Sequence, residues 1–324
     1  MRRLTSVVAA ASPVLQVVGK RSILGPNSNH QTSPHPRHQS YLRGEDLNQL
    51  TKWEDSMKKP TEYSNPTDHA VWDLKDVEKV TPTHKAPNDR LDNAALVIVQ
   101  TMRSIFDVVS GFTIGRKTEK KYITRIIFLE TVAGVPGMVA GMVRHLQSLR
   151  LLKRDHGWIH TLLEEAENER MHLLTFMEMR HVGILFRAAI LIMQGIFFNA
   201  FFLAYLVSPR FCHRMVGYIE EEAVKTYTHL LADIDAGVLP QFKVMQAPPI
   251  AVAYWKLKKD ATFRDLIVAV RADEASHRLV NHTFADMHVH DLADATNPFL
   301  EVDQVEPKSA EAPKPKADSK PPEK

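Results

Sequence analysis

Residues 158–180 read WIHTLLEEAENERMHLLTFMEMR, and this stretch decides the fold class of the chain. It contains no glycine or proline and is rich in residues that favour a helix. Within it, Glu169 precedes His172 by three positions, a spacing that places both side chains on one face of a helix. The stretch therefore predicts a helix that presents a carboxylate and an imidazole to the same point.

The same spacing recurs near the C-terminal end, where Glu274 precedes His277 in the sequence DEASH. Two further glutamates stand on other predicted helices, Glu130 in FLETVAG and Glu220 in YIEEEAV. One Glu from each of two helices, with Glu-x-x-His from each of two others, is the ligand inventory of ferritin-like di-iron bundles. The order of these motifs predicts a metal centre with four carboxylates and two histidines.

Charge explains why a pair of iron ions needs this inventory. Two cations about 3–4 Å apart repel each other, so anionic ligands must lie around and between them. A single Glu-x-x-His pair is weak evidence, because many such pairs face solvent, and we expect Glu164, Glu165 and Glu167 to form a solvated face. The ordered set on four helices, with Glu130 alone in an apolar run, favours two iron ions over a solvated face.

The rest of the body also predicts helices. No window shows sustained alternation of apolar and polar residues with turn dipeptides, so strands are not expected. Thr262 is the expected N-cap of the last helix, and Gly237 with Pro240 is the expected stop of the one before. We expect an all-α protein, a ferritin-like four-helix bundle with about two additional membrane-associated helices. The predicted helices cover residues 91–110, 119–150, 158–180, 184–207, 210–236 and 262–288.

Two apolar segments are candidates for membrane spans, residues 126–143 and residues 185–207. Glu130 lies inside the first, and it must meet the other glutamates at one point. We therefore expect residues 119–150 to be a bundle helix and residues 184–207 to lie along the bilayer surface, making the protein monotopic. The basic residues expected to meet anionic headgroups are Arg103, Arg187, Arg210 and Arg214.

The two ends differ in composition from the body. Residues 1–44 contain no Asp or Glu and carry Arg, Lys, Ser and Ala, as organelle transit peptides do. A secretory signal is the competing interpretation, but Pro13 interrupts its apolar run. We expect residues 1–44 to be a mitochondrial transit peptide and linker, residues 45–90 an extended arm, residues 91–300 the di-iron helical domain, and residues 301–324 a disordered tail.

Composition excludes several function classes. The net charge of +3 is too small to indicate nucleic-acid binding, and the 13 glycines form no phosphate-binding loop. The single cysteine, Cys212, excludes an intramolecular disulfide and clusters of thiolate ligands. Its basic neighbours would activate a thiol, but a small buried filler is the favoured interpretation of Cys212.

Four segments together resemble the signatures of the alternative oxidases: LETVAGVPGM (129–138), NERMHL (168–173), IEEEAV (219–224) and RADEASH (271–277). The resemblance extends over residues 70–298. It implies a cyanide-insensitive ubiquinol oxidase that reduces dioxygen to water without pumping protons. It also implies a homodimer on the matrix side of the mitochondrial inner membrane, with two non-haem iron ions and no nucleic acid.

The resemblance also implies roles for individual residues. Tyr227 corresponds to a tyrosine near the metals proposed to take part in electron transfer, although by pattern alone it is a core tyrosine, and Glu222 is expected to accept protons from the quinol. The iron ligands would be Glu130, Glu169, His172, Glu220, Glu274 and His277, with direct binding by the histidines left open. The quinol-associated positions are Arg103, Asp107, Arg125, Leu129, Ala223 and Thr226.

One departure from the plant members of the family concerns regulation. They carry a regulatory cysteine upstream of the catalytic body, whereas no cysteine precedes Cys212 here. We therefore expect no control by an intersubunit disulfide, and in this respect the sequence resembles the protist and fungal members. The alternatives are a plastid-type quinol oxidase, a di-iron hydroxylase of quinone biosynthesis, an iron-storage bundle, and a metal-free membrane scaffold.

Overall fold

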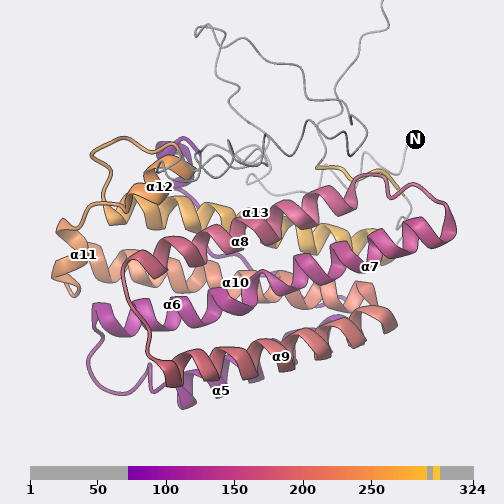
Figure 1. Ribbon diagram of the computed structural model, residues 1–324, viewed down its shortest axis with the longest axis horizontal. Helices are drawn as coiled ribbons and strands as arrows, with labels where there is room; N and C mark the ends of the chain where they lie inside the picture. Colours follow the sequence, from indigo (N-terminus) through magenta and orange to yellow (C-terminus); the bar gives the residue numbers. More distant parts are fainter. Residues whose placement is uncertain (1–71, 290–294, 300–324) are drawn as a thin grey trace, which may run out of the picture.

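The computed structural model describes residues 72–289 and 295–299, and these residues are helical with no named strand (Figure 1). The predicted leader (1–44), most of the arm (45–90) and the tail (301–324) lie outside the described residues. Within the arm, residues 72–89 contain one short helix. The helices are α4 (Leu74–Val77), α5 (Arg90–Val109), α6 (Glu119–Ala133), α7 (Val135–Leu151), α8 (Trp158–Glu178), α9 (Ile184–Val207), α10 (Pro209–Asp235), α11 (Pro240–Val244), α12 (Pro249–Tyr254) and α13 (Phe263–Val289).

The long helices begin and end close to the predicted residues, with one difference. The stretch predicted as one helix over 119–150 is divided into α6 and α7 at Gly134. Pro136 follows two residues later and has no N–H to donate to the carbonyl of Val132, so the hydrogen-bond ladder is interrupted there. The backbone N–H of Gly134 bonds to that carbonyl instead. The break lies one turn beyond Glu130.

Local sequence accounts for the boundaries of the last two long helices. The predicted N-cap Thr262 accepts a hydrogen bond from the backbone N–H of Asp265 at 3.2 Å, and the Asp265 carboxylate accepts one from the N–H of Thr262 at 2.8 Å. Helix α10 ends at Asp235, and Gly237 follows in a left-handed conformation with φ of 73°. Glycine adopts this conformation without steric cost, so the predicted stop signal is confirmed.

Four helices enclose the core. Helices α10 and α13 lie side by side over most of their length, and α6 and α8 pack against each other beside them (Figure 1). Buried side chains from all four helices form one apolar cluster, which includes Ile126, Met171, Val224 and Ile267. The all-α class is therefore confirmed, and the motif-bearing helices are the four that face one another.

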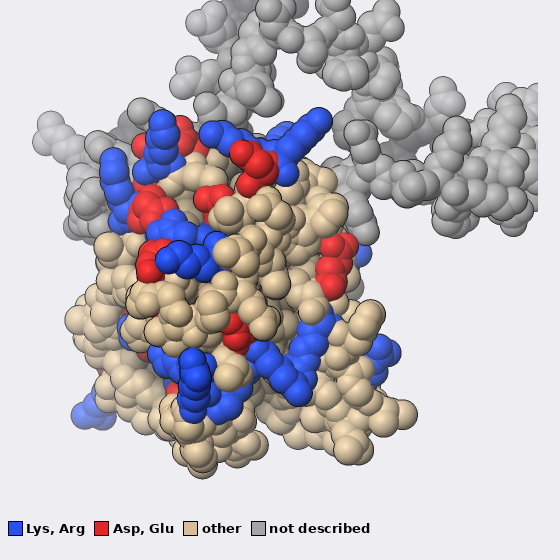
Figure 2. Space-filling model, turned by 90° about the vertical axis from the view of Figure 1, so that its left-hand side faces the viewer, with Lys and Arg blue, Asp and Glu red and all other residues tan. Residues whose placement is uncertain are grey.

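Helices α5 and α9 lie along one edge of the molecule (Figure 1). Helix α9 is long and apolar enough to cross a membrane, yet Phe201 and Tyr205 are its only buried residues. The segment Glu119–Leu151 is also long and apolar enough to cross a membrane, but half of its most apolar 18-residue stretch is buried inside the protein. Seen from the end, the lowest lobes along this edge carry no charged side chains, and Lys and Arg side chains lie just above them (Figure 2).

The expectation for Arg214 is wrong. Its side chain is fully buried and paired with Asp92 and Asp286, because α5 and α13 pack over it, so it cannot reach a lipid headgroup. Arg103 and Arg210 are also held in ion pairs with carboxylates of the chain. Arg187 is exposed.

Candidate metal centre

Six side chains from four helices converge in the middle of the bundle. Glu130 comes from α6, Glu169 and His172 from α8, Glu220 from α10, and Glu274 and His277 from α13. All six are buried, with exposed fractions of at most 7%. Ionised carboxylates are almost never buried in such numbers unless cations neutralise them.

The ligand atoms lie at distances that suit metal coordination. Glu130, Glu169, His172 and Glu274 form one group in which the ligand atoms all lie within 4.8 Å of one another, and Glu169, Glu220, Glu274 and His277 form a second. Two of the glutamates, Glu169 and Glu274, belong to both groups. Shared carboxylates between two groups are the arrangement that a pair of metal ions requires.

Histidine 172 is oriented by a carboxylate outside the cluster. Its Nε2 lies 3.0 Å from Oδ2 of Asp273, while its Nδ1 lies 3.5 Å from carboxylate oxygens of Glu130, Glu169 and Glu274. Asp273 in turn accepts hydrogen bonds from Trp72 at 2.5 Å and Trp255 at 2.8 Å. A carboxylate that fixes the far nitrogen of an imidazole is the usual partner of a metal-binding histidine.

The electrostatics of the cluster favour added positive charge. Burial raises the pKa of Glu130 to about 8 and holds the pKa of Glu220 well above its usual range, since an ionised carboxylate loses its hydration there. Burial alone would lower the pKa of His172 and of His277, but the surrounding carboxylates outweigh burial and raise both. Bound cations would neutralise the same carboxylates.

Unsatisfied polar atoms show that the donor set fits a metal. Among the described residues, Oε2 of Glu130, Oε2 of Glu169 and Nδ1 of His172 are buried without a hydrogen-bond partner, while Oε1 of Glu169 lies 2.7 Å from Nδ1 of His277 as an ion pair. Leaving a buried polar atom unpaired costs about 1–3 kcal/mol, and more for a charged group. Because these atoms face one another, metal ions bound between them would satisfy them together.

Three successive glutamates of α10 point in three directions. A helix turns by about 100° per residue, so Glu220 points into the metal cluster while Glu221 and Glu222 point elsewhere. The Glu221 carboxylate accepts hydrogen bonds from the N–H of Lys85 at 2.7 Å and from His282 at 3.0 Å. Glu222 accepts from Arg103 of α5 at 2.8 Å. The three glutamates of the IEEEAV segment thus contact the metal cluster, the arm and α5, respectively.

Three of the quinol-associated residues form one ionic chain with Glu222 beside the cluster. Arg103 bonds to Glu222 and, at 3.0 Å, to Asp107, whose other oxygen lies 2.5 Å from Nη1 of Arg125. The guanidinium of Arg125 lies over the ring of Phe106 at 4.8 Å and that of Phe112 at 4.5 Å.

The remaining predicted residues lie close to this chain in sequence and position. Tyr227 is buried, and its hydroxyl donates a hydrogen bond to Oε1 of Glu130 at 2.5 Å. Thr226 is buried and donates to the Glu222 carbonyl at 2.8 Å. Leu129 and Ala223 are half-buried beside Glu130 and Glu222 in the chain, and no polar contact joins them to Arg103, Asp107 or Arg125 among the described residues.

Comparison with known proteins agrees with this geometry. A sequence model described as alternative oxidase matches residues 72–286, which include the metal cluster and the ionic chain.

The chain belongs to the alternative oxidase family.

Several curated relatives named "Alternative oxidase, mitochondrial" are similar to it. One from Trypanosoma brucei brucei is 53% identical over 256 residues, which is 78% of each chain. One from Cryptococcus neoformans var. grubii is 48% identical over 251 residues, covering 71% of this chain and 62% of the relative. One from Emericella nidulans is 50% identical over 242 residues, covering 71% of this chain and 68% of the relative. The chain is thus an oxidoreductase with a buried cluster able to bind metal.

Sequence reasoning missed the partners that support this alternative oxidase cluster. Asn168 and Asp273 each directly precede a cluster glutamate, and their side chains bond to each other at 3.2 Å. A polar residue immediately before both Glu-x-x-His motifs was the available signal. The expectation of a solvated face at Glu165 is wrong, since Glu165 is 5% exposed and accepts hydrogen bonds from Asn281 at 2.9 and 3.0 Å.

The lone cysteine lies apart from the cluster. Cys212 is fully buried on α10, and burial raises the pKa of its thiol to about 12. A thiol with so high a pKa is not a nucleophile at neutral pH. The interpretation of Cys212 as a small filler fits this burial.

Proposed function

We propose that the protein oxidises ubiquinol and reduces dioxygen to water at two iron ions held by Glu130, Glu169, Glu220 and Glu274, with His172 and His277 as further ligands. The observation that carries the proposal is the convergence of these six buried side chains, several of whose facing atoms lack hydrogen-bond partners. Hard oxygen donors with imidazole, and no thiolate, suit ferrous and ferric iron. The reaction consumes two quinols for each dioxygen: two quinols supply four electrons and four protons, which yield two waters and two quinones.

The bound iron pair would supply two-electron storage and oxygen binding, and the protein would supply position and proton contacts. Arg125 is well placed to orient a quinol. It is 3% exposed, and its Nε and Nη2 have no hydrogen-bond partner among the described residues, so both can donate to a quinol oxygen. Leu129, Ala223 and Thr226 complete the pocket, and Glu222 accepts the quinol proton.

Tyr227 couples this substrate side to the metal ligands. Its hydroxyl donates to Glu130, and burial together with the nearby carboxylates of Glu130 and Glu274 holds its pKa well above the usual range. The phenol therefore stays protonated near neutral pH. It could give an electron to the bound iron pair while its proton moves to Oε1 of Glu130, which bound iron would keep ionised. A phenylalanine at this position would provide neither the hydrogen bond to Glu130 nor a transferable proton.

The surface of the protein and the names of its relatives support a proposed cellular setting. Exposed apolar residues on α5 and α9, including Ile105, Leu191 and Ile196, form one edge that would enter a single leaflet of a bilayer. Exposed Met138, Leu146 and Leu149 on α7 form a further apolar face, which would bind a second copy of the chain. The relatives are named mitochondrial, and the predicted leader agrees, so we place the protein on the matrix side of the inner membrane.

The test is oxygen uptake by the purified protein with a short-chain ubiquinol, with and without cyanide, together with analysis of the quinone product. Cyanide-insensitive uptake of one dioxygen for two quinols, with unmodified ubiquinone as product, is the expected result. A hydroxylated quinone product would instead establish the hydroxylase alternative. Absence of quinol-dependent uptake in an iron-loaded preparation would overturn the proposal.

A further inference from the structure

We propose that the buried ion pair between Asp92 and Arg214 is the anchor that positions α5, and with it Arg103 and Asp107, for substrate binding. The inference rests on the proposed function, because it assigns a positioning role toward the proposed quinol pocket. It concerns residues that neither touch the metal cluster nor face the substrate.

Helix α5 is attached to the bundle by few fully buried side chains. Of its 20 residues, the buried ones are Asp92, Ala95 and Val99. Besides these, only part-buried apolar side chains attach the helix, among them Leu96, which packs against the core, and Phe106, which stacks on Phe128. Most of its large apolar residues instead face outward: Val97, Ile98, Met102, Ile105, Val108 and Val109.

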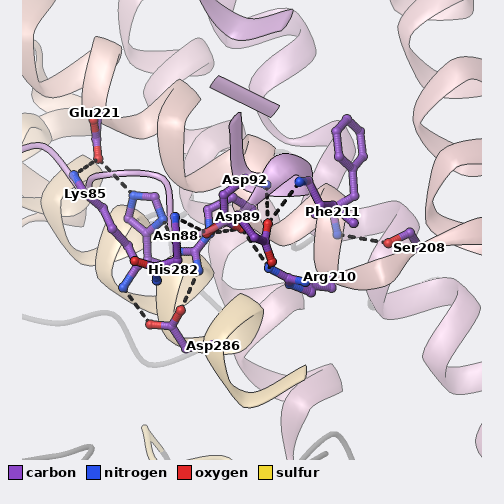
Figure 3. Close-up of polar contacts among 12 residues, drawn as sticks. Lys85, Asn88, Asp89, Asp92, Ser208, Arg210, Phe211, Glu221, His282 and Asp286 are labelled. Atoms are coloured by element: carbon purple, nitrogen blue, oxygen red, sulfur yellow. Dashed lines mark hydrogen bonds and ion pairs between the residues drawn. The ribbon is translucent and has the colours of Figure 1, made fainter. Parts of the chain in front are cut away.

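Asp92 provides the missing attachment at the N-terminal end of α5. Its side chain is fully buried, and Oδ1 accepts hydrogen bonds from Nε of Arg214 at 3.0 Å and from Nη2 of Arg210 at 3.1 Å. Oδ2 accepts from the backbone N–H of Asn88 at 3.2 Å. Figure 3 shows Asp92 and Asp89 turned toward Arg210 of α10. A buried carboxylate with its partners satisfied fixes both the register and the rotation of a helix.

Arg214 carries the attachment into the core of the bundle. Besides Asp92 it contacts Asp286 of α13, and its Nη1 donates to Nδ1 of His282 at 3.0 Å. That bond leaves Nε2 of His282 to donate to Glu221 at 3.0 Å. Gly217 makes the ring position possible, because a Cβ there would lie 2.5 Å from Nδ1 of His282. Arg214 therefore ties α5 to two of the helices that carry the metal cluster.

The opposite end of α5 depends on this anchor. Arg103 and Asp107 lie 11 and 15 residues beyond Asp92, or roughly 16 and 22 Å along the helix axis at 1.5 Å per residue. Their pairs with Glu222 and Arg125 join side chains of which only Arg125 is buried, the other three being 21–27% exposed. Partly exposed pairs stabilise weakly, so a loosened Asp92 end lets the Arg103 end leave its place beside Arg125.

The direct test is Asp92→Asn, measured as KM and kcat with a short-chain ubiquinol. If α5 is docked in only a fraction of the molecules, the apparent affinity for quinol falls in proportion to that fraction. The docked molecules still turn over at the normal rate. We expect KM to rise about fivefold to tenfold, with kcat at saturating quinol and iron content within about twofold of the parent protein. An unchanged KM in the folded variant overturns the proposal.

Asp286→Asn is the matched control. It removes another carboxylate of the same Arg214, but on α13 rather than on α5. The expected result is a parental KM despite a comparable loss of stability. If both variants raise KM equally, Asp92 acts through general stability and the positioning role is wrong.

Hydrogen exchange tests the anchor independently of activity, so a failure of the proposed function would not hide the answer. In Asp92→Asn, the amides of residues 96–108 should exchange at least about tenfold faster, with those of α13 unchanged. Equal exchange in α5 overturns the anchor. Should Asp92→Asn fail to fold, Arg210→Met removes one partner of Asp92 from the surface side. It is expected to raise KM about twofold and to speed exchange in α5, and parental values would again overturn the proposal.

Discussion

Helices α9 and α10 follow one another through the single residue Ser208, yet α9 exposes apolar side chains and α10 buries charged ones. The apolar helix α9 keeps Phe201 and Tyr205 inside and exposes the rest of its apolar residues. The more polar helix α10 buries Arg214, Glu220 and Glu221. In a protein surrounded only by water, an apolar helix is usually buried. The exposure of α9 supports the proposal that this helix faces lipid, whereas the interior around α10 holds ionisable groups.

Replacing Glu220 by alanine tests the charged interior around α10 and has the largest expected effect. Iron content and quinol-dependent oxygen uptake should both fall below detection, because one of the metal groups loses a carboxylate. The matched control is Glu167→Gln, an exchange on the partly exposed face of α8. Parental turnover in Glu220→Ala would refute the ligand assignment.

The same variant should invert its effect on stability when metal is removed. In the metal-free protein, Glu220→Ala removes a buried carboxylate whose pKa is raised by burial, so we expect the free energy of unfolding to increase by about 1–4 kcal/mol. In the iron-loaded protein it should decrease, since bound metal stabilises only the parental fold. Denaturant unfolding with and without chelator measures both signs, and equal signs would contradict a metal role.

Asp273→Asn should reduce, rather than abolish, metal binding. The carboxylate of Asp273 orients His172 from outside the cluster, and loss of such a partner weakens metal affinity about 10- to 100-fold. Competitive titration against a chelator of known affinity measures the change. Glu164→Gln on the solvent side of α8 serves as the control, and an unchanged affinity in Asp273→Asn would show that His172 needs no orienting partner.

Replacing Ile192 by glutamate tests the exposed apolar face of α9. Ile192 is 61% exposed, and a charge placed in the lipid costs about 2–3 kcal/mol, so co-sedimentation with vesicles that contain anionic lipid should weaken by about 30- to 150-fold. Leu163→Glu puts the same charge on α8, where the exposed fraction is 39%, and should leave vesicle binding unchanged. Equal vesicle binding by Ile192→Glu and the parent would mean that α9 does not enter the bilayer.

The smallest expected effect is a dependence of the free energy of unfolding on pH. Burial lowers the pKa of His213 to about 3 from the ordinary 6.5, so between these values the unfolded chain binds a proton that the folded chain does not. Stability should therefore fall as pH drops below 6.5, by about 1.4 kcal/mol per pH unit for this group. Urea unfolding of His213→Gln between pH 6.5 and 4.5 should show a shallower decline, whereas parallel declines would contradict a buried neutral imidazole.

Sequence alone predicted the helices and the cluster for a physical reason. Helix signals are local, and Glu-x-x-His on one helix face needs no tertiary information. The buried positions of Glu165 and Arg214 could not be predicted in this way, because their partners come from distant segments. Arg214 shows the limit best: its neighbours in the chain suggest a surface cation, whereas α5 and α13 bury it between two carboxylates. Pro136 is a local signal for the break at Gly134, but the apolar run around it favoured the prediction of one continuous helix.

Ferrous iron titration of the metal-free protein, followed to saturation by equilibrium dialysis and iron analysis, tests the central claim most directly. The account predicts two irons per chain, bound to the parental protein and lost in Glu220→Ala, because two ligand groups share Glu169 and Glu274. One iron per chain, or two that remain in Glu220→Ala, would contradict a paired metal centre at this site.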